Sequence, residues 1–259
     1  MREIKISKKN IVGYIGEDIY EMNAFGEGLE SRVFLYKDSD LYNRDVLLKY
    51  IRPLKHFVDY GASISLDMME NKRKKIELIE KMDCFKDEIK ILDAGYEFGE
   101  FRGFTMEKCP YERIDQFEDK RILIRYLKLI RDKIELLNSN NVYIGDFNST
   151  NFLTNKDKND IKMCDLDNLM IDGIDFDLKH KAIIKYKEKC NLIENIDSYC
   201  FNLFTIALLN YYNSGFVIDH LEECPLPDEL DNKENRDILD SMINLDNTYK
   251  KKYLINNIN

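Results

Sequence analysis

Hydrophobic residues in the first part of this 259-residue chain occur in short bursts separated by Gly, Asp and Asn. The clearest bursts lie at residues 33–35 and 46–51, and both are rich in branched aliphatic side chains. Short apolar runs between turn-forming residues are typical of β-strands. We therefore expect residues 1–60 to be mainly extended, with two further strands at 89–92 and 101–106.

Apolar residues recur at helical spacing in three other segments. Residues 66–82 place them three and seven positions apart, and the stretch from Leu123 to Leu137 carries a longer amphipathic stripe. Residues 199–212 are apolar on nearly every side. A one-sided stripe predicts a helix that packs on a neighbour, whereas a helix that is apolar all round is buried within a domain.

These patterns predict an α+β fold with two lobes. The first lobe, residues 1–106, is β-rich, and the second, residues 112–259, is mainly helical. Residues 107–111 lie between them as a hinge that contains Pro110, which lacks a backbone N–H and restricts the residue before it. Whether residues 213–259 complete the second lobe or bind a partner stays open at this level.

The overall composition narrows the classes of function. A formal net charge of −9 disfavours nonspecific nucleic-acid binding, and the basic runs at 72–75 and 250–252 are interpreted as solvated helix faces. No apolar run approaches the roughly 18 residues of a membrane-spanning helix, and the N-terminal residues lack a signal-peptide core. Six scattered cysteines without a CxxC pair argue against a zinc or disulfide framework. We expect a cytoplasmic protein that binds neither nucleic acid nor a membrane.

The strongest chemical signal is a set of oxygen-bearing side chains near the middle of the chain. Asp146 and Asn151 are five positions apart, and Asp165 ends an apolar run fourteen residues after Asn151. Carboxylate and amide oxygens are the ligands that Mg²⁺ takes beside the phosphates of a nucleotide, and a further carboxylate can orient a hydroxyl group. This spacing predicts phosphoryl-transfer chemistry.

Two features upstream fit the same chemistry. Gly26 and Gly28 form a turn ahead of a strand, and glycines let backbone N–H groups approach phosphates closely. Lys49 lies inside the strand-like run 46–49, from which a lysine can reach phosphate oxygens. Each feature is weak alone, and their order along the chain gives them weight.

This order of motifs resembles the protein-kinase-like superfamily over roughly residues 20–212. The resemblance implies that ATP binds with Mg²⁺, that Asp146 orients or deprotonates the acceptor hydroxyl, and that Asn151 and Asp165 ligate the metal. Lys49 would pair with the α- and β-phosphates. The further nucleotide-binding positions that it implies are Gly26, Gly28, Ser31, Val33, Met106, Glu107, Cys109 and Leu153.

Several positions depart from the family pattern. Lys75 stands in the register of the helix glutamate that normally pairs with the strand lysine, and Glu70 or Glu77 needs a shift in register to replace it. Gly145 precedes the catalytic aspartate where protein kinases carry arginine, which is closer to kinases of small molecules. Asp167 replaces the glycine of the metal-binding turn, either as a further ligand or as a solvated side chain.

Two more positions concern the support and the regulation of the predicted site. Asp197 resembles the family aspartate that clamps the backbone of the catalytic loop. Residues 166–196 contain no Ser or Thr and one Tyr, Tyr186, and Gly145 cannot pair with a phosphate as arginine does. We therefore expect an activity that does not depend on phosphorylation of this segment.

The leading hypothesis is an ATP- and Mg²⁺-dependent Ser/Thr protein kinase. One alternative is a kinase of small molecules, of the aminoglycoside or choline type, which Gly145 favours. Another is a pseudokinase that binds nucleotide or a partner, which Lys75 favours. The acceptor is accordingly a protein or a small hydroxyl compound, and the oligomeric state stays open.

Overall fold

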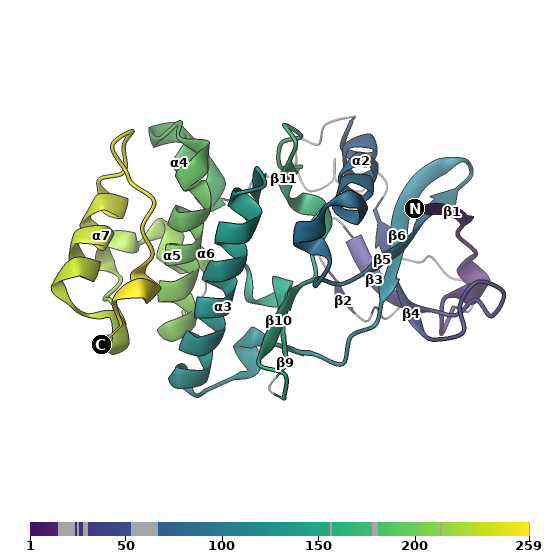
Figure 1. Ribbon diagram of the computed structural model, residues 1–259, viewed down its shortest axis with the longest axis horizontal. Coiled ribbons are helices and arrows are strands. Elements are labelled where there is room, and N and C mark those ends of the chain that lie inside the picture. Colours follow the sequence, from purple (N-terminus) through teal and green to yellow (C-terminus); the bar gives the residue numbers. More distant parts are fainter. Residues whose placement is uncertain are drawn as a thin grey trace. The chain divides into compact units, whose positions relative to one another are not determined.

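The computed structural model describes residues 1–14, 24, 26–27, 31–52, 67–155, 157–177, 181–212 and 214–258 (Figure 1). The chain divides into two compact units, Met1–Pro110 and Tyr111–Asn259. The division falls inside the segment 107–111 that the sequence marks as a connector. The first unit is built on a sheet and the second on helices, so the α+β fold class is confirmed.

Within the described residues, a six-stranded sheet forms the framework of the first unit. The strand order is β1-β5-β6-β4-β3-β2, with β1 at Arg2–Lys5, β2 at Gly26–Glu27, β3 at Ser31–Tyr36, β4 at Val46–Ile51, β5 at Ile91–Glu97 and β6 at Glu100–Glu107. Neighbouring strands are antiparallel, except that β1 pairs in parallel with β5. The strands expected from the apolar bursts and from the run at 101–106 are confirmed, whereas the strand expected at 89–92 begins at Ile91 and extends to Glu97. The parallel pairing of β1 has no signal in the sequence.

Helix α2 (Met68–Lys81) packs against β5 and β6. Its buried face carries Met68, Ile76 and Ile79, and Lys72 and Lys75 lie on the same face with no exposed surface. The interpretation of residues 72–75 as a solvated face is therefore wrong for these two lysines. Four consecutive helical residues point in more than one direction, and positions 72 and 75 share the apolar face because they are three apart.

A buried carboxylate fastens the edge strand β1 to the sheet. The Arg2 guanidinium donates to both oxygens of Asp93 on β5, at 2.6 and 2.7 Å, and the Tyr42 hydroxyl donates to Asp93 at 2.6 Å. Burial raises the pKa of the Asp93 carboxyl, but the hydrogen bonds from Arg2 and Tyr42 outweigh it, so the pKa lies below its usual value of 3.8. The charged form of Asp93 therefore stabilises the first unit.

The fastening of β1 predicts a loss of stability in acid. A carboxyl with a lowered folded-state pKa stabilises the fold above its unfolded pKa of about 3.8, and this contribution disappears as the pH falls through the folded-state pKa. We expect Asp93→Asn to lower the free energy of unfolding by about 2 kcal/mol at pH 7 and by much less near pH 2. Urea unfolding across that range measures the difference. The exposed Asp87→Asn is the control, and a pH-independent loss for Asp93→Asn would contradict the prediction.

Helices α3 (Lys120–Asn138) and α5 (Ile196–Leu209) lie side by side at the centre of the second unit (Figure 1). The apolar stripe predicted for α3 is confirmed, because all six of its members are buried. Every residue of α5 is buried, as the apolar run at 199–212 predicts, although the helix begins and ends three residues earlier. The other α-helices in the described part of the second unit are α4 (Lys181–Lys189), α6 (Ser214–Asp219) and α7 (Lys233–Ile243).

The described part of the second unit also contains two small sheets. One has the order β10-β9-β7, with β7 at Glu112–Arg113, β9 at Phe152–Asn155 and β10 at Asp160–Met163. The other pairs β8 (Val142–Tyr143) with β11 (Met170–Ile171) in antiparallel orientation. The loop from β8 to β9 therefore begins beside the end of the β10–β11 segment, where Tyr143 pairs with Met170, and ends beside the start of that segment, where Phe152 pairs with Met163. β9 begins directly after Asn151, and β10 lies in the apolar run that precedes Asp165.

The last part of the chain packs on the central helices. We call residues 249–257 the C-terminal segment. The Asn195 amide donates to the carbonyl of Tyr249, and the Asn202 amide donates to that of Lys252, both at 2.9 Å. Residues 195 and 202 are seven apart on one face of the helix, so this segment satisfies polar groups that would otherwise be costly inside the unit. The described residues after 213 thus belong to the second unit.

The basic run in this segment is not a helix face. Lys250 and Lys252 are exposed while Lys251 is half-buried, because an extended chain turns alternate side chains in opposite directions. The interpretation of residues 250–252 as a solvated helix face is therefore wrong.

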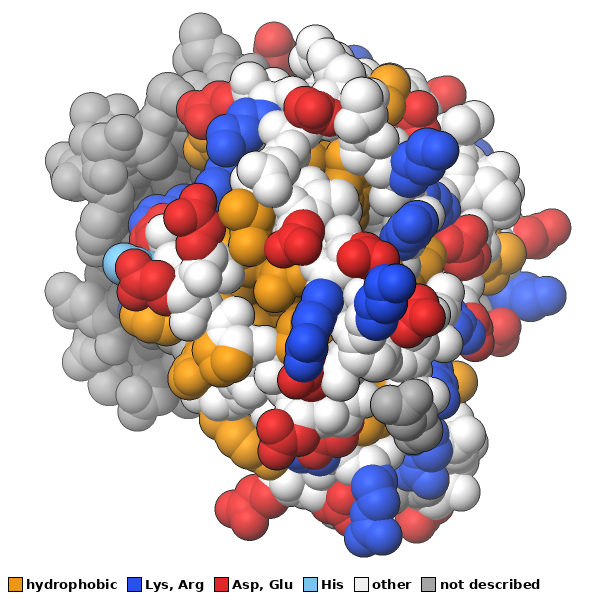
Figure 2. Space-filling model, turned by 90° about the vertical axis from the view of Figure 1, so that its left-hand side faces the viewer, with side chains coloured by type: hydrophobic (Ala, Val, Ile, Leu, Met, Phe, Trp, Pro, Cys, Tyr) orange, Lys and Arg blue, Asp and Glu red, His pale blue; other side chains and the backbone are white. Residues whose placement is uncertain are grey.

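Acidic and basic side chains are interspersed over the face of the molecule that carries α7 (Figure 2). Among the described residues, no helix has both the length and the apolar character needed to cross a bilayer.

Candidate functional site

The loop from β8 to β9 carries Asp146 and turns sharply just before it. Gly145 has a φ of +64°, and a Cβ atom there would lie 2.7 Å from the ring of Phe176 and 2.8 Å from the side chain of Ile183. Both the left-handed backbone and the tight packing thus require glycine. The Asp146 N–H closes the turn by donating to the carbonyl of Ile144 at 2.6 Å.

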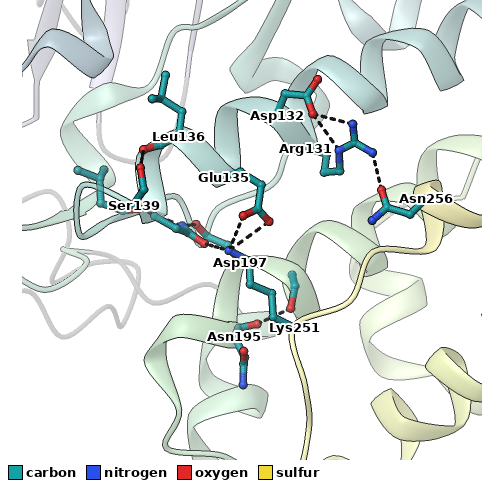
Figure 3. Close-up of polar contacts among 12 residues, drawn as sticks. Arg131, Asp132, Glu135, Leu136, Ser139, Asn195, Asp197, Lys251 and Asn256 are labelled. Carbon is teal, nitrogen blue, oxygen red and sulfur yellow. Dashed lines mark hydrogen bonds and ion pairs between the residues drawn. The ribbon is translucent and has the colours of Figure 1, made fainter.

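A buried carboxylate on α5 holds this turn. Asp197 has no exposed surface and accepts hydrogen bonds from the backbone N–H of Gly145 at 2.8 Å and of Ile144 at 3.0 Å. The Asn138 amide, at the end of α3, donates to Asp197 at 2.7 Å. The structural role predicted for Asp197 is confirmed. Figure 3 shows how Asp197 and the polar residues around it come together from α3, α5 and the C-terminal segment.

Burial and hydrogen bonding act in opposite directions on Asp197. Burial raises the pKa of its carboxyl above the usual value, although the N–H groups of Ile144 and Gly145, the Asn138 amide and the positive charge of Lys251 all favour the charged form. The carboxylate can hold the loop only while these donors stay in place.

Two aromatic side chains anchor the loop on the other side of Asp146. The Phe147 ring lies 5.7 Å from Phe201 and 6.3 Å from Phe204 of α5, and 6.0 Å from Phe152 at the start of β9. Such ring pairs add to the free energy of apolar burial. Asp146 therefore lies between Gly145, whose N–H is hydrogen-bonded to Asp197, and Phe147, whose ring packs on α5. These two contacts fix the backbone of Asp146, while its side chain is half-buried.

The β9–β10 hairpin brings the other two predicted ligands together. Phe152 pairs with Met163, so Asn151 just before β9 lies opposite the residues just after β10. The Cys164 N–H donates to the Asn151 carbonyl at 3.1 Å, and Asp165 is the next residue. The Asn151 side-chain amide donates to the Asp146 carboxylate at 3.2 Å and to its backbone carbonyl at 3.3 Å.

Asp146, Asn151 and Asp165 line one small pocket of the second unit. The rest of its lining is Ile144, Phe152, Met163, Asn168 and Leu169. Two carboxylates and an amide on a partly apolar wall offer the oxygen atoms that a hard cation such as Mg²⁺ prefers. Among the described residues, no cluster of three or more His, Cys, Asp or Glu side chains is suited to a metal ion.

Two other predicted residues of the second unit lie away from this pocket. Asp167 has no exposed surface, so its interpretation as a solvated side chain is wrong, and it does not line the pocket. It belongs to the 3₁₀ helix Leu166–Asn168, whose residues are all buried. Leu153 is half-buried on β9 and is also absent from the pocket lining.

Lys49 lies on β4, inside the sheet of the first unit. Its side chain is 5% exposed, and its Nζ lies 5.8 Å from the centre of the Phe104 ring on β6. The neighbouring Gly103 has a φ of +149°, and a Cβ atom there would come within 1.9 Å of the Lys49 carbonyl oxygen. Only glycine permits this close approach of the two strands, which sets the position of Lys49.

Most of the other predicted nucleotide contacts of the first unit belong to the same sheet as Lys49. Val33 pairs with both Gly26 and Lys49 across neighbouring strands. Ser31 and Met106 are buried, and Glu107 ends β6, where its carboxylate accepts hydrogen bonds from the Lys90 N–H and the Cys109 thiol. Gly28 lies outside the described residues.

The two glutamates of α2 that could replace Lys75 in register pair with an arginine of the same helix. Arg73 donates to Glu70 at 2.8 and 2.9 Å, and it also pairs with Glu77 one turn further on. Lys75 occupies the buried face of this helix. The register argument that puts Lys75 rather than a glutamate on the face toward the sheet is confirmed.

A second pocket, of about 370 Å³, lies beside the loop. Asn148 and Ser149 form one wall, and Tyr211 and Tyr212 at the end of α5 form another. The Ser149 hydroxyl donates to Asp115 at 2.9 Å, which fixes the loop at this wall. The pocket adjoins the residues that directly follow Asp146 and Phe147 in the chain.

The sequence does not indicate the polar residues that support Asp197. Asn138 belongs to an Asn- and Ser-rich run that predicts a helix end, and α3 does end there. Lys251 belongs to a run that predicts a solvated surface. Nothing in their spacing connects either residue with Asp197, which is 59 positions from Asn138.

No protein-family model matches this chain, and no curated protein is similar enough in sequence to count as a relative.

The clamp at Asp197 predicts a specific loss in an isosteric variant. Asp197→Asn removes the charge and places an amide N–H₂ against at least one of the backbone N–H groups. We expect the free energy of unfolding to fall by about 2–4 kcal/mol, and hydrogen exchange at the amides of Ile144 and Gly145 to become faster. Denaturant unfolding and site-resolved exchange measure these changes. Asp132→Asn, whose carboxylate is 62% exposed, serves as control. Unchanged exchange at both amides would show that the carboxylate does not hold the loop.

Proposed function

We propose that this protein is an ATP- and Mg²⁺-dependent phosphotransferase of the protein-kinase-like type that acts on hydroxyl groups of Ser or Thr in proteins. The observation that carries the proposal is that Asp146, Asn151 and Asp165 line one pocket. The order of sequence motifs indicates these three residues as one site before any contact is known. Their convergence supports a common chemical role.

The proposed reaction is in-line transfer of the γ-phosphoryl group. The acceptor oxygen forms a bond to phosphorus as the bond to the β–γ bridging oxygen breaks, and the acceptor proton passes toward Asp146. Mg²⁺ would be held by Asn151 and Asp165 and would neutralise charge on the phosphates. Since the Asn151 N–H₂ group donates to Asp146, its Oδ1 is the atom suited to the cation. This hydrogen bond also orients Asp146.

The first unit would supply the nucleotide contacts other than Leu153, which belongs to the second unit. The proposal assigns Lys49 to the α- and β-phosphates and the backbone around Gly26, Gly28 and Ser31 to the phosphate oxygens. The pairing of Gly26 with Val33 and of Val33 with Lys49 supports a common location for these residues within the sheet. The residues proposed to contact adenine are Val33, Met106, Glu107, Cys109 and Leu153.

One observation favours a second candidate, a nucleotide-binding pseudokinase. Glu70 and Glu77 are both held by Arg73, and Lys75 takes the buried position on α2. An active protein kinase normally needs a glutamate from this helix to orient the strand lysine. The transfer experiment below separates the two candidates.

The proposal is tested by transfer of radiolabel from γ-³²P-ATP in the presence of Mg²⁺. We expect label on the protein itself or on a protein of a cell lysate, and a fall of at least about a hundredfold in Asp165→Asn, because a metal ligand is lost. The control is Asp157→Asn, an exposed aspartate in the turn of the same hairpin, which should label like the wild type.

Other outcomes contradict the leading proposal. Mg²⁺-dependent ATP binding without label would leave the small-molecule kinase or the pseudokinase, and ATP hydrolysis stimulated by small alcohols or aminoglycosides would separate these two. Equal labelling by wild type and Asp165→Asn would show that Asp165 is not a metal ligand. No ATP binding in a thermal-shift assay would exclude a nucleotide site.

The burial of Tyr186 predicts that phosphorylation of this residue does not control the proposed activity. Its hydroxyl is buried, donates to the Leu192 carbonyl at 2.7 Å and accepts from the Cys190 thiol at 3.0 Å. Burial, together with the Cys190 contact, raises the pKa of this hydroxyl well above its usual range. A phosphate on it would have to disrupt this packing. We expect phosphatase treatment to leave the transfer rate unchanged and Tyr186→Phe to keep it within about twofold of the wild type. A phosphatase-sensitive activity that Tyr186→Phe abolishes would refute this.

A further inference from the structure

A residue of the C-terminal segment, Lys251, contacts the Asn138 amide that donates to Asp197. The Lys251 ammonium donates to the Asn138 Oδ1 at 3.0 Å and lies 3.2 Å from each carboxylate oxygen of Glu135 (Figure 3). The Asn138 N–H₂ group in turn donates to Asp197 at 2.7 Å and to the carbonyl of Val142 at 3.1 Å. Lys251 is therefore two hydrogen bonds away from the carboxylate that holds the loop.

We propose that Lys251 is a positioning residue, which fixes the Asn138 amide and thereby keeps the Asp197 carboxylate on the backbone of the loop that carries Asp146. The inference rests on the proposed function only in the role that it gives to Asp146. The hydrogen-bond chain itself belongs to the second unit and does not depend on nucleotide binding.

The first argument is the orientation of the Asn138 amide. Both of its N–H bonds are used, one toward Asp197 and one toward the Val142 carbonyl, and its oxygen faces Lys251. The flipped amide would place its oxygen against these two acceptors and its N–H₂ group against an ammonium ion. Since an ammonium ion can only donate, Lys251 selects one of the two orientations.

The second argument is the charge around Asp197. A buried carboxylate remains ionised only if donors and positive charge offset its desolvation. The positive charge of Lys251 is one of the influences that favour the ionised form of Asp197. Glu135 lies beside Lys251 on α3, and it holds the ammonium group near Asn138 although it is itself half-exposed. Removing Lys251 would both free the amide and withdraw positive charge from the clamp.

The third argument is the way in which the segment is held. The backbone on both sides of Lys251 is fixed to α5, through the Tyr249 and Lys252 carbonyls and through the Leu254 N–H, which donates to Asn202 at 3.0 Å. The rings of Tyr249 and Tyr253 are buried against α5. The Lys251 side chain therefore projects from a fixed point, so little entropy is lost when it binds Asn138.

The experiment compares hydrogen exchange at the amides of Ile144 and Gly145 in wild type and Lys251→Met, using the full chain. Methionine keeps an unbranched apolar stem and removes the ammonium group. We expect exchange at these two amides to become roughly fivefold faster, while the amide of Ile130 in the middle of α3 is unchanged. Lys250→Met, an exposed neighbour with the same change of charge, is the matched control and should leave both amides unchanged. Lys251→Arg should restore most of the protection.

A double-variant cycle keeps the test decisive. Asn138→Ala breaks the chain at its middle, so Lys251→Met should have little further effect on the exchange in that background. Additive effects of the two substitutions, or unchanged exchange in folded Lys251→Met, would overturn the inference. Both results can be read without any assay of activity.

The kinetic readout then links the clamp to the proposed reaction. In Lys251→Met we expect kcat to fall about fivefold and the KM for ATP to stay within about twofold, because the residue acts on the position of Asp146 and touches no nucleotide. A wild type without transfer activity would refute the proposed function, and the exchange measurements would still decide the role of Lys251. An unchanged kcat together with faster exchange would overturn the link to Asp146.

Discussion

The second unit depends on the burial of one negative charge. A carboxylate without exposed surface is tolerated only where several donors converge on it. Asp197 meets this condition with backbone N–H groups of the loop and with an amide at the end of α3. The fully buried helix α5 provides the position, and α3, β8 and the loop have to meet there. Because Asp197 needs hydrogen-bond donors from the protein itself, the backbone at the start of the loop is held in one position.

The hairpin that follows fixes the other end of the loop by a different interaction. Its register places the residue before β9 opposite the residues after β10, so that Asn151 and Asp165 are neighbours although fourteen positions separate them. A shift of one residue would turn the side chains of one strand to the opposite face relative to the other strand, and the two residues would no longer face the same pocket. Phe152 and Met163, which form the terminal pair of the register, are buried and resist such a shift. A buried charge at one end and an apolar pair at the other thus hold Asp146 between them.

The sequence predicts much of this arrangement, because each part leaves a local pattern. Apolar bursts indicate the strands of the first unit, an all-round apolar run indicates α5, and the spacing of Asp146, Asn151 and Asp165 indicates the residues that line one pocket. The remainder could not be predicted, for physical reasons. The direction of Lys72 and Lys75 depends on the register of α2 against its sheet, and the burial of Asp167 depends on tertiary packing. The contact of Lys251 with Asn138 joins positions 113 apart, and no local period encodes it.

The internal support of the loop bears on the residue before Asp146, which is arginine in the protein kinases that the sequence resembles and Gly145 in this chain. An arginine before the catalytic aspartate allows a phosphate on a distant segment to order the loop, so that the ordered state has to be created. Here Gly145 leaves no charge for a phosphate to bind, and its lack of a side chain lets Phe176 and Ile183 pack directly against the turn. The donors that order the loop are part of the folded unit: two backbone N–H groups, an amide, and the ammonium group that orients the amide. Under the proposed function, a loop ordered in this way needs no phosphate on a distant segment to become ordered. The lack of Ser and Thr in residues 166–196 and the burial of Tyr186 agree with this expectation, because the segment offers no accessible hydroxyl group for a phosphate.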